Sequence, residues 1–94
     1  MKKIAIITGA TGGLGKEFVA ALSEKEQKET GLDEIWAIAR NTEKLAKLRE
    51  IYGDSVVTIC ADLSDSKEIN RIAGMLEQEN PEIRYLINNA GTGK

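Results

Sequence analysis

The sequence predicts one α/β domain, built as a doubly wound parallel sheet of four strands with three helices over residues 1–94. Short apolar runs that do not alternate with polar residues suit strands buried on both faces. Between these runs, apolar residues recur at the helical period. Strand and helix alternate along the chain, and right-handed helical crossovers between parallel strands then place helices on both faces of an open sheet.

Four short runs rich in β-branched residues are the expected strands: Ile4–Thr8, Ile35–Ala39, Val56–Ala61 and Tyr85–Asn88. The third run contains Cys60, the single cysteine of the chain. One cysteine excludes a disulfide framework, and its apolar surroundings predict a buried thiol. This cysteine usage fits a reducing, cytoplasmic location.

Three apolar stripes at helical spacing indicate the helices: Leu14, Phe18 and Leu22; Leu45, Leu48 and Tyr52; and Ile69, Ile72 and Leu76. Asn41 or Thr42 can cap the second helix and Gly53 can end it. Asp65 with Glu68 can form a capping box for the third helix, Ser66 to Glu79, which Pro81 follows. We expect Phe18, Trp36 and Tyr52 to pack in the core, and the charged run Ser23 to Glu34 to be a solvated helix end and loop.

The composition narrows the classes of function. The chain is 41% apolar and 30% charged, as is ordinary for a globular protein. A net charge of −2 and the absence of histidine give no basic field for nucleic acid and no histidine for acid, base or metal chemistry. The apolar run Ile4 to Ile7 is too short for a signal-peptide core. These features predict a cytoplasmic protein with small-molecule partners, and no nucleic-acid or membrane partner.

The stretch TGATGGLG, from Thr8 to Gly15, follows the first expected strand and opens the first helix. Glycines let the backbone adopt positive φ and let a phosphate approach amides that a Cβ would block. The helix amino terminus adds unpaired N–H groups and a partial positive charge. The stretch therefore predicts a pyrophosphate cradle. A tight strand-to-helix turn without a ligand is the alternative.

At these residues the chain resembles the short-chain dehydrogenases/reductases. Thr8, Gly9, Gly13 and Gly15 match the TGxxxGxG motif of the main branch, while Gly12 also fits the TGxxGxxG form of the epimerase and dehydratase branch. Two later motifs of the main branch follow: Asp62-Leu63 after the third strand, and NNAG at Asn88-Asn89-Ala90-Gly91.

The resemblance implies a partial Rossmann-like fold with strand order 3-2-1-4 and a site for a nicotinamide dinucleotide. It assigns the binding of that cofactor to Gly9, Thr11, Gly12, Gly13, Leu14, Gly15, Arg40, Asn41, Asp62, Leu63, Asn89, Ala90 and Gly91. Asn88 is expected to satisfy backbone groups at the strand end. Asp62 has a second interpretation, as a turn or cap acceptor.

The end of the second strand indicates which dinucleotide binds. Ala39 stands where an NAD enzyme has a carboxylate for the ribose hydroxyls. Arg40, the next residue, can donate charge-assisted hydrogen bonds to a 2′-phosphate. NADP is therefore predicted over NAD; in the alternative interpretation Arg40 is one more solvated surface arginine.

The family reaction needs a tyrosine and a lysine three or four residues beyond it, downstream of NNAG. Neither Tyr52 nor Tyr85 has a lysine at that spacing, so no catalytic residue can be named. We expect the chain to be the cofactor-binding, amino-terminal part of an NADP-dependent alcohol/ketone oxidoreductase, truncated before the catalytic segment, and inactive alone. A non-catalytic nucleotide-binding module and the start of an epimerase-type enzyme are the alternatives. The fourth strand would then be an unprotected sheet edge beside a poorly covered face, which predicts a homo-oligomer.

Overall fold

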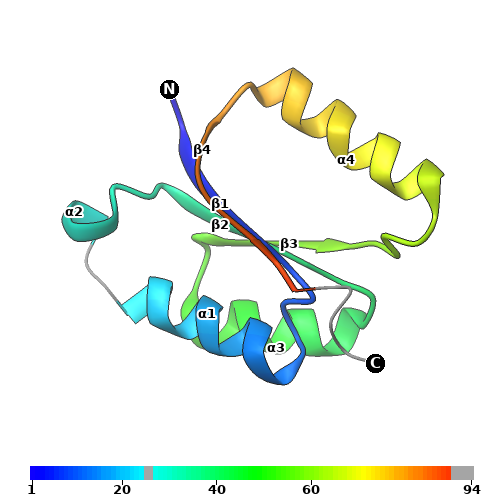
Figure 1. Cartoon of the computed structure of the whole chain (residues 1–94). Coiled ribbons are helices and arrows are strands. Elements are labelled where there is room, and N and C mark those ends of the chain that lie inside the picture. The colour runs from blue at the N-terminus through cyan, green and yellow to red at the C-terminus, as the bar shows by residue number, and fades with distance from the viewer. Residues whose placement is uncertain (25–26, 90–94) are drawn as a thin grey trace.

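The computed structural model describes residues 1–24 and 27–89, and it places a parallel sheet between two layers of helices (Figure 1). The elements in chain order are β1 (Lys3–Thr8), α1 (Gly13–Glu24), α2 (Gln27–Thr30), β2 (Glu34–Ala39), α3 (Thr42–Tyr52), β3 (Val56–Cys60), α4 (Ser66–Glu79) and β4 (Glu82–Asn88).

The four strands are all parallel and lie in the order β3-β2-β1-β4, which confirms the predicted doubly wound topology. Ile6 pairs with Trp36 on one side and with Leu86 on the other. Because the strands are parallel, their carboxyl ends and the loops that follow them meet at one edge of the sheet.

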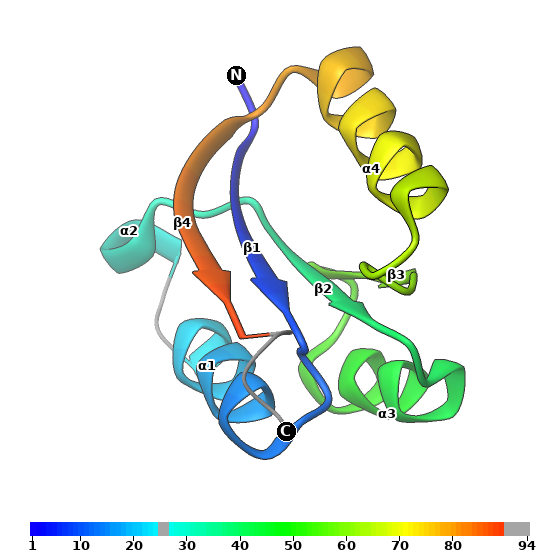
Figure 2. The ribbon, with the colours of Figure 1, turned by 45° about the vertical axis from the view of Figure 1, so that its right-hand side comes forward.

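Helices α1 and α3 cover one face of the sheet, and α4 lies over the opposite face (Figures 1 and 2). On the first face a buried apolar cluster contains Ala5 and Ile7 of β1, Val19 of α1 and Leu45 of α3. Phe18 and Tyr52 pack against this cluster, as predicted. Its residues alternate along β1 with those of the other face, as the pleat of a strand requires.

The cluster under α4 is smaller. Ile4, Ile6 and Trp36 pack there with Ile72, the one buried residue of α4. Leu86 of β4 pairs with Ile6 and shares this face, yet it is 65% exposed. On this face the core therefore ends at β1, and the part beside β4 is poorly covered, as expected, whereas Ile87 of β4 packs against the cluster on the other face.

The helix ends follow the predicted capping residues. Asn41 caps α3, with its side chain accepting from the Lys44 N–H, and Gly53 ends that helix at φ 91°. Asp65 caps α4 by accepting from the Lys67 N–H. The carboxylate of Glu68 accepts from Arg71 instead of closing the predicted capping box.

The structure corrects several boundaries and exposures. The run Ser23 to Glu34 is not only a solvated helix end and loop, because it includes the short helix α2 and the buried residues Thr30 and Leu32. Leu14 and Ile69 are exposed instead of completing their stripes. Both lie in the first turn of a helix.

β4 begins at Glu82, three residues before the predicted start at Tyr85. Its pairing with β1 shifts register between Ile4 and Ala5, so that Arg84 has no partner in the ladder. This irregularity and the Arg84–Glu82 ion pair lie on the outermost strand, where we expected no protective feature. Bulges and charges are common protections of sheet edges.

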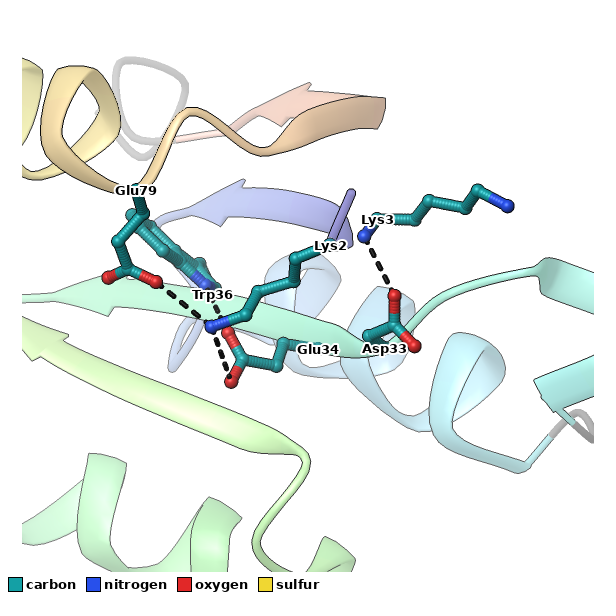
Figure 3. Close-up of polar contacts among 6 residues, drawn as sticks. All are labelled: Lys2, Lys3, Asp33, Glu34, Trp36 and Glu79. Atoms are coloured by element: carbon teal, nitrogen blue, oxygen red, sulfur yellow. Dashed lines mark hydrogen bonds and ion pairs between the residues drawn. The ribbon is translucent and has the colours of Figure 1, made fainter.

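A polar cluster ties the chain start to the sheet and to the end of α4 (Figure 3). Lys2 Nζ donates to Glu79 Oε1 at 2.9 Å and lies 3.3 Å from Glu34 Oε2. The indole N–H of buried Trp36 donates to the other oxygen of Glu34 at 3.0 Å. The hydrogen bond that Lys2 donates to Glu79 is the largest cause of a pKa of Lys2 raised above its ordinary value of 10.5. Desolvation, the next cause, opposes this rise, and the hydrogen bond to Glu34 and the charges of both carboxylates support it.

Candidate cofactor site

The carboxyl ends of the strands carry most of the residues that the sequence singled out. The glycine stretch follows β1, Arg40 and Asn41 follow β2, and Asp62 and Leu63 follow β3. Asn89 follows β4 next to β1. The predicted site is therefore brought together from four loops at one edge, apart from Ala90 and Gly91, which lie outside the described residues.

The loop after β1 depends on two glycines in close contact. Gly9 has φ 61°, and its carbonyl accepts from the Gly12 N–H at 3.1 Å. A Cβ on Gly15 would lie 2.0 Å from the Gly9 carbonyl oxygen. Only glycine at position 15 lets the first turn of α1 pack this closely on the loop.

The amino terminus of α1 is open beside this contact. The Lys16 N–H donates to the Gly12 carbonyl at 3.0 Å, so the N–H groups of residues 13–15 precede the repeating bonds of the helix. A Cβ on Gly13 would meet nothing within 4 Å, and Leu14 is exposed. Gly12, Gly13 and Leu14 are exposed, and N–H groups at such a helix start fit the phosphates of a dinucleotide.

Thr8 joins the glycine loop to the end of β4. Its hydroxyl donates to Asn88 Oδ1 at 2.9 Å and accepts from the Asn89 N–H at 2.8 Å. The Asn89 side-chain amide also reaches the Gly9 carbonyl at 3.5 Å. Asn88 thus bonds a side-chain hydroxyl, where we had expected it to satisfy backbone groups. Thr8 was missed as a site residue, although polar residues ending two strands adjacent in the predicted order were a usable signal.

On the side of β1 opposite β4, Cys60 joins the loops after β2 and β3. Its thiol is exposed, contrary to the predicted burial, because it ends an edge strand beyond the apolar layer and meets the start of α3. The thiol donates to the Arg40 carbonyl at 3.4 Å and lies 3.3 Å from the Thr42 hydroxyl. Arg40 itself is exposed, whereas the Asn41 side-chain oxygen is engaged in capping α3.

Asp62 serves as a turn acceptor. One oxygen of its carboxylate accepts from the Ser64 hydroxyl at 2.7 Å and from the Ser64 N–H at 3.0 Å. These two bonds, and to a smaller extent the positive charge of Arg40, lower the pKa of Asp62 below 3.8. Leu63 packs against the apolar cluster under α4. A contact of either residue with adenine stays a prediction.

The described residues hold no group of three side chains able to bind a metal ion, and no helix among them is long and apolar enough to cross a membrane. Tyr52 ends α3 and Tyr85 lies in β4, both away from the loops that form the site. Among the described residues, this edge of the sheet therefore has no tyrosine paired with a lysine.

Comparison with known proteins identifies the family. The model for short chain dehydrogenase matches residues 3–94. The NADPH-dependent 1-acyldihydroxyacetone phosphate reductase of Saccharomyces cerevisiae is 36% identical over 93 residues, which cover 96% of this chain and 29% of that protein. A crystal structure of a short chain dehydrogenase from Bacillus anthracis has a TM-score of 0.74 at 25% identity, over 94% of this chain and 34% of that one.

A closed form of serine dehydrogenase complexed with NADP+ has a TM-score of 0.70 at 25% identity, covering 88% of this chain and 31% of that one. The chain therefore spans about three tenths of the length of these relatives. The chain belongs to the short-chain dehydrogenase family.

Proposed function

We propose that residues 1–94 form the cofactor-binding, amino-terminal part of an NADP(H)-dependent reductase that transfers hydride between a nicotinamide and an alcohol or ketone. The close contact of Gly15 with Gly9 carries this proposal, because it opens the end of α1 toward a phosphate. Thr11, Gly12, Gly13 and Leu14 would border the pyrophosphate. The bound dinucleotide would supply the hydride chemistry, while this chain binds and orients it.

The preference for NADP rests on the end of β2. Ala39 leaves no carboxylate there to repel a 2′-phosphate, and the exposed Arg40 follows it. The Cys60 thiol holds the Arg40 backbone carbonyl, and the exposed guanidinium can bind a phosphate. One relative is NADPH-dependent and one structural neighbour was solved with NADP+, which supports the same choice.

The proposal assigns no catalysis to the chain alone, since none of its tyrosines precedes a lysine at the family spacing. We expect Asp62 and Leu63 to contact the adenine ring, and Asn89, Ala90 and Gly91 to border a ribose. The single cysteine favours a cytoplasmic protein. Purified chain with NADPH and a ketone should give no turnover above the buffer blank.

The test compares 2′,5′-ADP with 5′-AMP as ligands of the 94-residue chain, measured by calorimetry or NMR titration. If Arg40 binds the 2′-phosphate, 2′,5′-ADP binds more tightly, by about 10- to 150-fold for a charged hydrogen bond of about 1.5–3 kcal/mol. Arg40→Ala should remove most of this difference. Arg49→Ala, which removes an exposed arginine of α3, is the matched control and should keep it. Equal affinities in the unmodified chain would contradict the NADP proposal.

A further inference from the structure

β3 is an edge strand, paired with β2 alone. The peptide between Cys60 and Ala61 directs its N–H to β2, where it donates to the Ala39 carbonyl at 2.9 Å. In a trans peptide the carbonyl points the opposite way. The Cys60 carbonyl therefore faces the open edge of the sheet, where no strand can bond it.

Arg71 of α4 takes the place of the missing strand at this carbonyl. Its Nη2 donates to the Cys60 carbonyl oxygen at 2.8 Å. Its Nε donates at 3.0 Å to Glu68 Oε2, one turn earlier on the same helix. Two bonds from one planar guanidinium fix its orientation, because the donors of arginine have a rigid geometry.

The carbonyl that Arg71 holds lies directly before the loop with the predicted adenine contacts. Two residues later, Asp62 accepts from Ser64 through its side chain and from the Asp65 N–H through its carbonyl, at 3.0 Å. Through its thiol, Cys60 also donates to the Arg40 carbonyl. Cys60 thus connects the loop after β2 with the loop after β3, and Arg71 anchors Cys60 to α4.

We propose that Arg71 is a positioning residue for the adenine and ribose end of the nucleotide: by holding the Cys60 carbonyl to α4, it sets the placement of Asp62 and, through the thiol, of Arg40. Arg71 itself does not contact the nucleotide. This inference rests on the proposed function, because it concerns the same site.

The test uses Arg71→Ala, Arg71→Lys and the control Arg49→Ala in the 94-residue chain. Loss of one hydrogen bond worth about 0.5–1.5 kcal/mol corresponds to a loss of affinity for 2′,5′-ADP of about 2- to 13-fold. We expect a loss of this size for Arg71→Ala. Arg71→Lys should recover most of it, because an ammonium group can still donate to the carbonyl. Arg49→Ala should bind like the unmodified chain.

Amide hydrogen exchange of the ligand-free chain gives a second measurement that does not depend on binding. In Arg71→Ala the amides of Ser64 and Asp65 should exchange faster by a similar factor, while those of Ile6 and Ala37 in the central strands stay unchanged. Equal acceleration at the central strands would indicate a general loss of stability and would overturn the positioning role.

Failure of the inference differs from failure of the proposed function. If the unmodified chain binds 2′,5′-ADP and Arg71→Ala binds it equally well, the role of Arg71 is overturned and the proposed function stands. If the unmodified chain binds neither 2′,5′-ADP nor 5′-AMP, the proposed function fails, and the proposed role of Arg71 in nucleotide binding fails with it.

Discussion

The hydroxyl of Thr8 lies 2.9 Å from the side-chain oxygen of Asn88, a residue 80 positions later in the chain. The same hydroxyl accepts from the Asn89 N–H, so it fixes the end of β4 against the first residue of the glycine loop. One side chain thereby connects the loop predicted to hold the pyrophosphate to the segment predicted to border a ribose.

Removing this hydroxyl should destabilise the fold. Thr8→Val keeps the shape of a residue that is only 7% exposed but leaves the Asn89 N–H and the Asn88 oxygen without it. We expect the free energy of unfolding to fall by about 0.5–1.5 kcal/mol in urea titrations, the usual net contribution of a hydrogen bond, because Asn88 is exposed and Asn89 is half-buried. Thr8→Ser keeps the hydroxyl and should lose less. A valine variant as stable as the serine variant would contradict the role assigned to these bonds.

A methyl group at position 15 should be far more harmful than one at position 13. The Cβ of Gly15→Ala would meet backbone atoms of Gly9, which cannot move aside as a flexible side chain can. We expect a loss of about 1–3 kcal/mol or more, as for overpacked sites. Gly13→Ala has open space and should fold at least as stably, because alanine favours a helix. Thermal unfolding followed by circular dichroism compares the two, and equal midpoints would rule out the close approach of α1 to the loop.

The contact of Lys2 with Glu79 and Glu34 should make stability depend on alkaline pH. The pKa of Lys2 is raised in the folded chain. The stability that Lys2 contributes is therefore fully present below pH 10.5 and is lost as the pH rises through the raised pKa. Lys2→Met should therefore lower the unfolding midpoint at neutral pH, and the difference from the unmodified chain should shrink above 10.5. The fluorescence of Trp36, which bonds Glu34, reports the transition. Lys47→Met, at another exposed lysine, is the control. An equal dependence of stability on pH in both variants would contradict the role assigned to the contacts of Lys2.

We propose that the chain self-associates through β4 or through the uncovered face beside it. Leu86 is 65% exposed on that face, and β4 has a free edge. Leu86→Lys should shift the chain toward monomer in sedimentation experiments at micromolar concentration, since it charges the apolar surface. Ile51→Lys changes an equally exposed residue of α3, 69% accessible, and should leave association unchanged. A compact monomer of the unmodified chain would refute the proposal.

The sequence by itself determined the four strands, the helices α1, α3 and α4, their order and the position of the glycine loop, but it did not predict the short helix α2. Apolar spacing and capping residues act within a few positions of one another, and Ser66–Glu79 was predicted with both its ends correct. The four glycines of the loop predict a phosphate site, because a helix that starts after a buried strand has the same open N–H groups in any sequence.

Tertiary structure alone decided which side chains meet. Thr8 finds Asn88 only because β1 and β4 become neighbours, and Arg71 holds the Cys60 carbonyl only because β3 lies at an edge. The same edge exposes the thiol that the local apolar pattern predicted to be buried. The local spacing of apolar residues indicates the conformation of a segment. The burial and the partners of its residues depend on elements distant in the chain, because the strand order of the sheet sets which elements become neighbours.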